Sequence, residues 1–152
     1  MASKIPSEIY EGILEHSIIL AVDVVIYNDK GEVFLAKRTQ DPCKDQWWIP
    51  GGRQFKREMP EKTALRKAIE EVGLEIKVEK LIMMEDIIFD ETDFPNVKTG
   101  VHYVARVYLA KYIGGSVKLD NTQSEYKWVN KIDENYHPYV KRALIASGIF
   151  SN

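Results

Sequence analysis

The chain is poor in several features that would place it in a specialised class of protein. Its single cysteine, Cys43, excludes an internal disulfide bond and fits a reducing compartment. Its net charge of −2 lacks the basic excess that general nucleic-acid binding favours. No apolar run approaches the roughly 18 residues of a membrane span, and residues 1–16 lack the compact apolar block of a secretion signal. We therefore expect a cytoplasmic protein whose partners are neither nucleic acids nor membranes.

The 152 residues have the length and composition of one soluble globular domain, which we expect to span residues 1–152. A run rich in valine and isoleucine at 17–27 predicts a largely buried strand. An apolar stripe that starts with a proline, from Pro60 to Val72, predicts the central helix. The other expected elements are a short helix at 6–15, an extended piece at 47–50, strands at 32–38, 75–84, 86–89, 101–112 and 125–129, and a terminal helix within 134–147. Many strands with one central and one terminal helix predict an α/β or α+β sandwich.

Two adjacent glutamates, Glu70 and Glu71, stand near the end of the central helix in RKAIEEVGL, residues 66–74. A basic residue stands four positions before each of them, a spacing that is common on solvated helix faces. Glu58, in the preceding loop, could fold back beside the helix and add a third carboxylate. Carboxylates clustered with backbone carbonyls suit Mg²⁺, which shares its coordination shell with phosphate and water. Taken alone, this segment favours an exposed helix end over a metal site.

The residues before this helix end extend the pattern. Gly52, five residues, Glu58, seven residues, Arg66 and then KAIEEVGL together resemble the Nudix box, G-x5-E-x7-R-E-U-x-E-E-x-G-U, in which U is apolar. Every specified position matches except one, because the box has glutamate where this chain has Lys67. The resemblance covers about residues 17–130. It implies a Nudix α/β/α sandwich with a mixed central sheet, which hydrolyses a nucleoside diphosphate linked to another group with Mg²⁺ or Mn²⁺.

By position, the resemblance also implies a metal site on the box helix. Glu71 and Glu70 carry over as ligands, and Glu58 carries over as a supporting carboxylate. The backbone carbonyl of Gly51 or Gly52 would be a further ligand, and Arg66 would orient a carboxylate by ion pairing. The cation would neutralise pyrophosphate charge and stabilise the departing nucleoside diphosphate.

The flanks of the box resemble those of the GDP-mannose mannosyl hydrolase subgroup, in LAVDVVI, GEVFLAKRT, WWIPGGRQFKRE and HPYVKRAL. In that subgroup water attacks the anomeric carbon of the sugar and releases GDP. The resemblance implies that Asp23 contacts the sugar or GDP, and that Tyr103 reaches the leaving diphosphate. Arg38 and Arg53 would bind the diphosphate, since a guanidinium donates to two oxygens at once, and Arg53 would stabilise the leaving charge. The implied substrate is GDP-mannose or GDP-glucose, and a homodimer is also implied.

The late loop departs from the subgroup, which has a Gln-His pair there as metal ligand and general base. This chain has Gln123, which we expect to be a metal ligand, but none of its three histidines lies in that loop. An amide cannot serve as the base, so a nearby carboxylate, Glu125 or Asp120, is the candidate.

Three aromatic positions near the pattern have an ordinary structural interpretation. We expect Trp47 and Trp48 to be core or loop-packing residues, with stacking on a nucleobase as the alternative. We expect His102, beside Tyr103 on a predicted strand, to have a structural role.

Two features leave the reaction open. The box retains both Glu70 and Glu71, whereas the subgroup typically keeps only the second, so a pyrophosphatase that attacks phosphorus in a nucleoside diphosphate derivative or a triphosphate is an alternative. Lys67 and the missing histidine also admit a nucleotide-binding module without turnover, in which the ammonium occupies the place of the cation. In an active enzyme Lys67 would lower the negative charge of the helix. We therefore predict one tightly held Mg²⁺, on Glu71 with help from Glu70.

Overall fold

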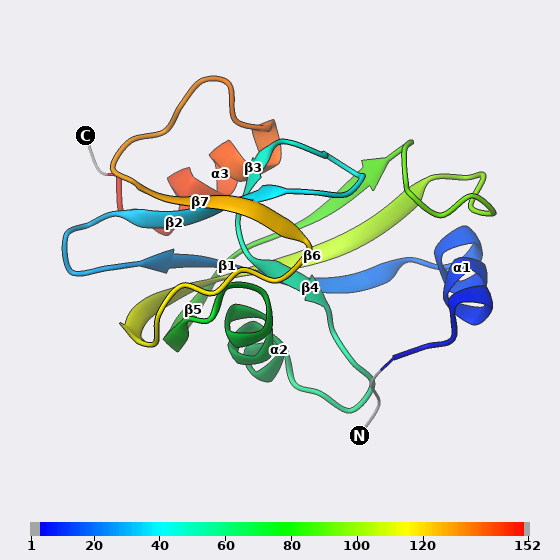
Figure 1. Ribbon diagram of the computed structural model, residues 1–152, viewed down its shortest axis with the longest axis horizontal. Helices are drawn as coiled ribbons and strands as arrows, with labels where there is room; N and C mark the ends of the chain where they lie inside the picture. The colour runs from blue at the N-terminus through cyan, green and yellow to red at the C-terminus, as the bar shows by residue number, and fades with distance from the viewer. Residues whose placement is uncertain (1–3, 151–152) are drawn as a thin grey trace.

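A mixed β-sheet with helices against both of its faces makes up the fold (Figure 1). The computed structural model describes residues 4–150. Its strands are β1 (Ile19–Tyr27), β2 (Val33–Arg38), β3 (Trp47–Trp48), β4 (Gly51–Arg53), β5 (Glu75–Phe89), β6 (Val101–Gly114) and β7 (Gln123–Val129). Its helices are α1 (Ser7–His16), α2 (Pro60–Lys67), which a π-helical turn (Ala68–Val72) extends, and α3 (Pro138–Ser147). The predicted sandwich, with its mixed sheet, central helix and C-terminal helix, is confirmed.

Strand β1 lies at the centre of the sheet and places one polar residue of interest. The main path of the sheet is β3-β2-β1-β6-β5, with β4 paired to β1 and β7 paired to β2. The pair of β1 and β6 is parallel, and the other pairs are antiparallel. In this register Asp23 of β1 lies opposite Gly51 of β4. The sheet therefore brings a carboxylate beside Gly51, the residue just before the predicted box, although the two are 28 residues apart in the chain.

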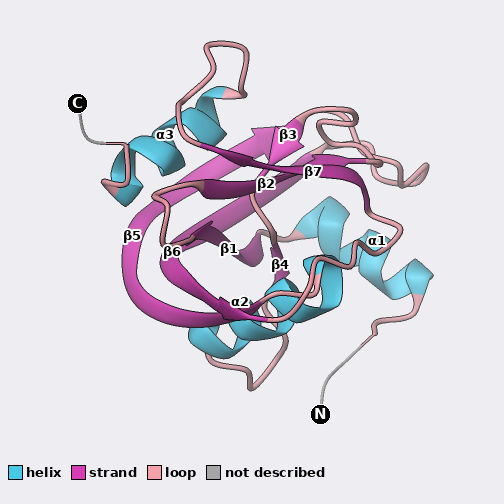
Figure 2. Ribbon diagram, turned by 60° about the vertical axis from the view of Figure 1, so that its left-hand side comes forward, coloured by secondary structure: helices cyan, strands magenta, loops and turns pink. Residues whose placement is uncertain are grey.

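Strand β1 is apolar along its length because both of its faces are covered. Val22, Val24 and Ile26 pack in the cluster that includes residues of α2, whereas Val25 packs in the cluster that includes α3. Figure 2 shows these two helices on opposite sides of the sheet. A strand buried on both faces loses the alternation of polar and apolar residues, which explains the nearly continuous apolar run at 17–27.

Three predicted boundaries differ in the structure. The strands expected at 75–84 and 86–89 form one strand, β5, because irregular pairing with β6 lets it continue through two shifts of register between Val78 and Met83. No strand was predicted directly after the extended piece at 47–50, but Gly51–Arg53 forms β4 against β1. The terminal helix begins at Pro138, where the side chain of His137 caps it by accepting a hydrogen bond from the Tyr139 N–H at 3.0 Å.

The central helix changes its winding where the predicted metal carboxylates lie. It is α-helical over Pro60–Lys67 and π-helical over Ala68–Val72, and it ends at Gly73, whose φ of +77° suits glycine. Single π-helical turns occur frequently at functional sites. Here the turn contains both adjacent glutamates, of which Glu71 is buried and Glu70 is exposed.

Helix α1 is fastened to the loop that precedes β6 (Figure 1). The carboxylate of Glu15 accepts hydrogen bonds from the backbone N–H groups of Lys98 and Thr99, at 2.6 and 2.7 Å. The Tyr10 ring meets the Phe94 ring edge to face, with 5.5 Å between their centroids. None of the helices within residues 4–150 is both long and apolar enough to cross a membrane.

Candidate active site

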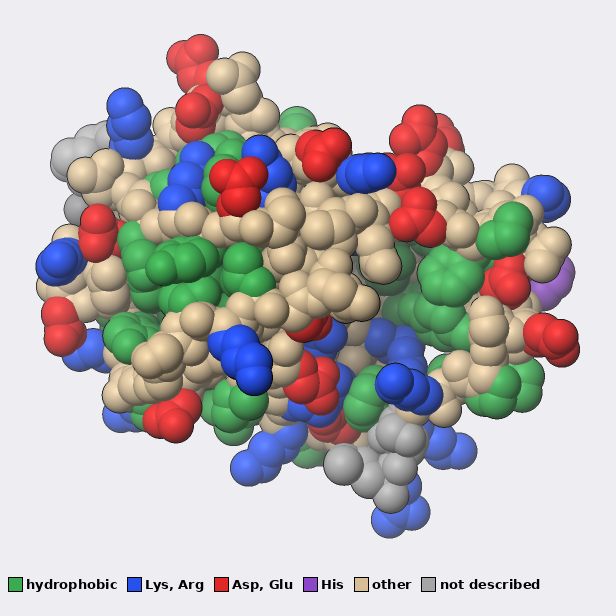
Figure 3. All heavy atoms as spheres, viewed as in Figure 1, with side chains coloured by type: hydrophobic (Ala, Val, Ile, Leu, Met, Phe, Trp, Pro, Cys, Tyr) green, Lys and Arg blue, Asp and Glu red, His purple; other side chains and the backbone are tan. Residues whose placement is uncertain are grey.

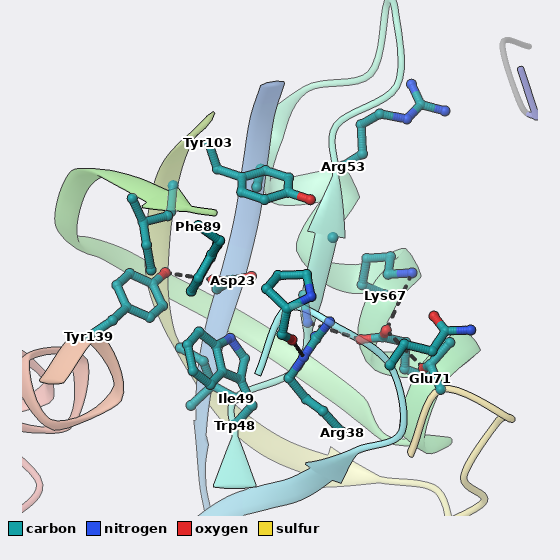
Figure 4. Close-up of a pocket in the computed structure, with 18 of the residues that line it drawn as sticks. Asp23, Arg38, Trp48, Ile49, Arg53, Lys67, Glu71, Phe89, Tyr103 and Tyr139 are labelled. Carbon is teal, nitrogen blue, oxygen red and sulfur yellow. Dashed lines mark hydrogen bonds and ion pairs between the residues drawn. The ribbon is translucent and has the colours of Figure 1, made fainter. Parts of the chain in front are cut away.

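A cavity of about 320 Å³ opens between β1, β4 and the central helix. Figure 3 shows a hollow in this face of the molecule, where basic and acidic side chains lie beside hydrophobic ones. The residues predicted for the site that line the cavity are Asp23, Arg38, Gly51, Arg53, Glu71, Tyr103 and Gln123. These residues come from five strands and the central helix, so the fold gathers them from across the chain (Figure 4).

Glu71 is the helix carboxylate that enters this cavity. The residue is only 6% exposed, and its Oε1 accepts a hydrogen bond from the Gly51 N–H at 3.0 Å. Its Oε2 accepts one from the Thr122 hydroxyl at 3.3 Å and lies 3.6 Å from the Lys67 Nζ. Burial raises the pKa of Glu71, and the nearby Lys67 ammonium opposes that rise. The arrangement holds one carboxylate at the cavity wall with a cation beside it.

Glu58 is not in the cavity, because it is held by Arg66. Its carboxylate accepts hydrogen bonds from the Arg66 Nε at 2.8 Å and Nη2 at 2.9 Å, from the Thr63 hydroxyl at 2.7 Å and from the Phe55 N–H at 3.1 Å. The Arg66 guanidinium is the main cause of a lowered pKa for Glu58, which falls to about 2. The expected pairing of Arg66 with a box carboxylate is therefore present, and it fixes the loop before the helix.

Glu70 also lies outside the residues that line the cavity. Its side chain is 50% exposed, and its Oε2 lies 3.2 Å from the Arg66 Nη1 and 3.9 Å from the Lys67 Nζ. Its carboxylate faces solvent and shares its cationic partners with Glu58 and Glu71. The structure thus separates the three carboxylates of the box, and it brings one of them to the cavity.

The Glu58–Arg66 pair predicts how the protein responds to acid. Because the pKa of Glu58 is lowered, its stabilising contribution is present above pH 4.5 and is lost as the pH falls from about 4.5 to about 2. We expect Glu58→Gln to lower the free energy of unfolding at pH 7 by about 1–3 kcal/mol and to have a much smaller effect near pH 2. Urea unfolding at several pH values measures this difference. An equal loss of stability at pH 7 and pH 2 would contradict the assignment.

The side-chain oxygen of Gln123 accepts no hydrogen bond from the described residues. The residue is 8% exposed and lines the cavity, and within residues 4–150 no donor reaches its Oε1. A buried oxygen without a donor is costly unless a ligand, an ion or a water satisfies it. The Glu71 carboxylate and Gly51 line the same cavity, and oxygen ligands are what Mg²⁺ prefers.

Glu71 and Gln123 offer one carboxylate and one amide oxygen to a cation. Within the described residues no group of three or more acidic, histidine or cysteine side chains could hold a metal ion. A cation held by Glu71 and Gln123 would therefore take most of its ligands from water and substrate, which is the usual situation of Mg²⁺ at phosphate-binding sites.

Asp23 lies deep in the protein, but part of its side chain is open to the cavity. It accepts a hydrogen bond of 2.5 Å from the hydroxyl of Tyr139, on α3 (Figure 4). Desolvation raises the pKa of Asp23 to about 7, and the negative charge of Glu71 adds to that rise. The carboxylate is thus a hydrogen-bonding group held at a fixed position in a largely apolar wall.

The two predicted arginines and Tyr103 line the same cavity. The Arg38 Nε donates to the Pro42 carbonyl at 2.7 Å, which orients its guanidinium. The Arg53 guanidinium lies over the Phe55 ring, 4.7 Å from its centroid. Burial raises the pKa of Tyr103 to about 12, so its hydroxyl remains a hydrogen-bond donor at neutral pH. The site therefore offers cationic groups and one neutral donor to an anionic ligand.

The two carboxylates considered as general base do not line the cavity. Glu125 forms an ion pair with Lys37 at 3.1 Å, and its side chain is exposed. Asp120 accepts hydrogen bonds from the backbone and hydroxyl of Thr122, at 2.9 and 2.5 Å. The pairing of β2 with β7 shifts register between Gln123 and Tyr126, which breaks the regular alternation of faces along this part of β7.

An aromatic wall completes the cavity, and most of it escapes prediction from the sequence. Trp48 stacks on Tyr139, with centroids 5.5 Å apart, so it is a packing residue that also lines the cavity. Trp47 does not line it. The wall also includes Tyr10 from α1 and Phe89 from the end of β5. Tyr139 was detectable only as part of HPYVKRAL, and nothing in the local sequence marks the other two.

His102 has the structural surroundings that the sequence suggested. Its Nε2 lies 2.7 Å from the Asp86 carboxylate on the neighbouring strand β5. The residue does not line the cavity, so it is not among the groups that could act there.

Comparisons with known proteins identify sequence and structural relatives of this chain. The family model described as "NUDIX domain" matches residues 18–144. The chain is 29% identical over 144 residues to "Low-salt glycan biosynthesis protein Agl8" of Haloferax volcanii, which covers 95% of this chain and 91% of that protein. A MutT NUDIX hydrolase from Burkholderia pseudomallei is 26% identical with a TM-score of 0.67, over 86% of this chain and 98% of that one. A MutT protein from Methanosarcina mazei Go1 is 25% identical with a TM-score of 0.62, over 74% of this chain and 76% of that one.

Proposed function

Because the chain belongs to the Nudix family, we propose that it hydrolyses a nucleoside diphosphate sugar with a bound Mg²⁺ or Mn²⁺ and releases the nucleoside diphosphate and the free sugar. GDP-mannose and GDP-glucose are the proposed substrates. The observation that carries this proposal is the contrast between the two ends of the cavity. One end gathers cationic side chains around Glu71, and the other presents a single carboxylate, Asp23, in an aromatic wall.

The cationic end suits a diphosphate. Arg38 and Arg53 would bind its oxygens, and Tyr103 would donate a hydrogen bond to the leaving group. Glu71 and the unsatisfied Oε1 of Gln123 would hold the metal ion, with the Gly51 carbonyl as the proposed third protein ligand. The bound cation would neutralise charge that accumulates on the diphosphate as the bond breaks.

The opposite end suits a small hydroxylated group. The Asp23 carboxylate can accept hydrogen bonds from sugar hydroxyls, and the Tyr139 hydroxyl holds it in place. Trp48 and Phe89 offer apolar surface beside it, and their rings lie 6.2 Å apart. Pockets of this kind, mostly apolar with a few fixed polar groups, bind small ligands in a defined orientation.

The relatives support a substrate of this class. The name of the Haloferax protein places that protein in low-salt glycan biosynthesis. A reducing, cytoplasmic location for this chain stays a prediction from its single cysteine.

Hydrolysis of GDP-mannose in ¹⁸O-labelled water tests the proposal. We expect turnover that requires Mg²⁺ or Mn²⁺, with the label in the free sugar, because water attacks the anomeric carbon. Label in phosphate would instead support attack at phosphorus, the pyrophosphatase alternative. No turnover of a panel of nucleotide sugars with either metal would overturn the substrate class, and release of pyrophosphate from nucleoside triphosphates would replace it.

A further inference from the structure

We propose that Lys67 is a built-in cation of the substrate site, which binds a diphosphate oxygen directly and takes the place of a second metal ion. This inference shares one assumption with the proposed function, namely that the ligand of the site contains a diphosphate. It predicts that the protein binds a diphosphate without metal and holds one divalent ion per chain when metal is present.

The Lys67 side chain reaches from the central helix into the cavity. Lys67 lines the cavity, and only 18% of its side chain is exposed, which is little for a lysine. Its Nζ lies 3.6 Å from the Glu71 Oε2, at a distance typical of an ion pair and longer than a good hydrogen bond. Figure 4 shows the ammonium between Glu71 and Arg53. The ammonium therefore stands where an anionic ligand can reach it from the cavity.

Gly52 gives Lys67 the room for this position. A Cβ atom at residue 52 would lie 2.5 Å from the Lys67 Cε and 3.1 Å from its Nζ. The lysine stem consequently packs directly on the backbone of the glycine, at the edge of the cavity. A larger residue at 52 would push the ammonium away from its present place.

The charged side chains around the cavity favour an anionic ligand over a second metal ion. Its charged lining residues are three cations and two carboxylates: Arg38, Arg53 and Lys67, with Asp23 and Glu71. Glu58 is occupied by Arg66, and the half-exposed Glu70 lies 3.9 Å from the Lys67 Nζ, slightly farther than Glu71 at 3.6 Å. A second divalent ion would meet the Lys67 ammonium beside the one helix carboxylate available to it, and like charges at such distances repel. A diphosphate, in contrast, gains a contact with the same ammonium.

Metal-free binding of inorganic pyrophosphate and GDP tests this inference. Calorimetric titrations in EDTA should show that the wild type binds both ligands and that Lys67→Met weakens both about tenfold or more, because a hydrogen bond between charged groups is lost. Lys67→Arg should keep the affinity within about threefold, since it retains the charge. Lys62→Met is the matched control, because Lys62 lies on the same helix, is exposed and does not line the cavity.

A count of bound metal gives the second measurement. Titration of Mn²⁺ in the presence of GDP, followed by electron paramagnetic resonance, should give about one ion per chain for the wild type and about two for Lys67→Glu, which replaces the repelling charge by a carboxylate. Unchanged metal-free affinity in Lys67→Met, or more than one ion in the wild type, would overturn the inference. Thermal unfolding of each variant separates these results from a loss of folding.

The outcomes also separate this inference from the proposed function. Pyrophosphate has neither base nor sugar, so its dependence on Lys67 does not require that a nucleotide sugar be the substrate. If Lys67→Met weakens pyrophosphate binding but no nucleotide sugar is hydrolysed, the inference stands and the proposed substrate fails. If nucleotide sugars are hydrolysed but Lys67→Met binds pyrophosphate as the wild type does, the inference fails alone.

Discussion

Replacing Glu71 by glutamine should lower kcat/KM for a nucleotide sugar by at least about a hundredfold. The carboxylate is the helix acidic group that reaches the cavity, where it accepts the Gly51 N–H and lies beside Gln123 and Lys67. Glutamine keeps the shape and can still accept the Gly51 hydrogen bond, but it removes the charge that would hold the cation. Steady-state kinetics with Mg²⁺ measures the loss, and Mn²⁺ titration should show weaker metal binding in the same variant.

The neighbouring glutamate provides the comparison for this experiment. Glu70→Gln alters an exposed side chain that does not line the cavity, so its effect on kcat/KM should be well below that of Glu71→Gln. Equal losses in the two variants would show that both glutamates hold the metal, as the sequence suggested. Full activity in Glu71→Gln would contradict the metal site proposed here.

Replacing Asp23 by asparagine should make the protein more stable and less active. The folded protein raises the pKa of Asp23 to about 7, from an ordinary value near 4, so ionising this carboxylate opposes folding at neutral pH. Because the side chain is partly open to the cavity, we expect a gain of about 1–3 kcal/mol and a rise in Tm of several degrees. Asparagine can still accept the Tyr139 hydrogen bond, but it lacks the charge for sugar hydroxyls, so kcat/KM should fall about tenfold to a hundredfold.

The dependence on pH distinguishes this explanation from a general effect of the substitution. A carboxyl with a raised pKa costs no stability below about pH 4, where it is protonated in both states, and the cost grows as the pH rises to about 7. The advantage of Asp23→Asn should therefore grow between pH 4 and pH 7 and stay constant above it. Denaturant unfolding across this range measures it. A lower stability of the variant at pH 7 would contradict the interpretation of Asp23 as a strained functional group.

The resemblance to the Nudix box and its flanking segments predicted the fold and most of the candidate residues that line the cavity. The interval from Gly52 to Glu58 and Arg66 located the central helix and the loop before it, and the apolar run of β1 located the middle of the sheet. These features are readable because they follow from local rules, namely helical periodicity and burial of a strand on both faces.

The sequence did not predict which of the box carboxylates faces the cavity. Glu58, Glu70 and Glu71 are equally acidic in the sequence, and the structure divides them by burial and by competition for Arg66. The two adjacent glutamates lie in a π-helical turn, and Glu71 is buried whereas Glu70 is exposed. Glu125 does not line the cavity, and the pairing of its strand with β2 is irregular. Such irregular pairing depends on the partner strand and cannot be predicted from the residues of one strand.

The cavity wall has a consequence for the order in which the protein acquires activity during its synthesis. One side of the wall is Tyr10, near the start of the chain, and another is Tyr139, which binds Asp23 across 116 positions of sequence. A ribosome-bound chain that has already released the whole Nudix box still lacks α3, and with it the hydroxyl that fixes Asp23. The nascent protein can therefore contain Glu71 and both arginines before the cavity wall around Asp23 is complete, and we expect catalytic competence to arrive only with the last helix.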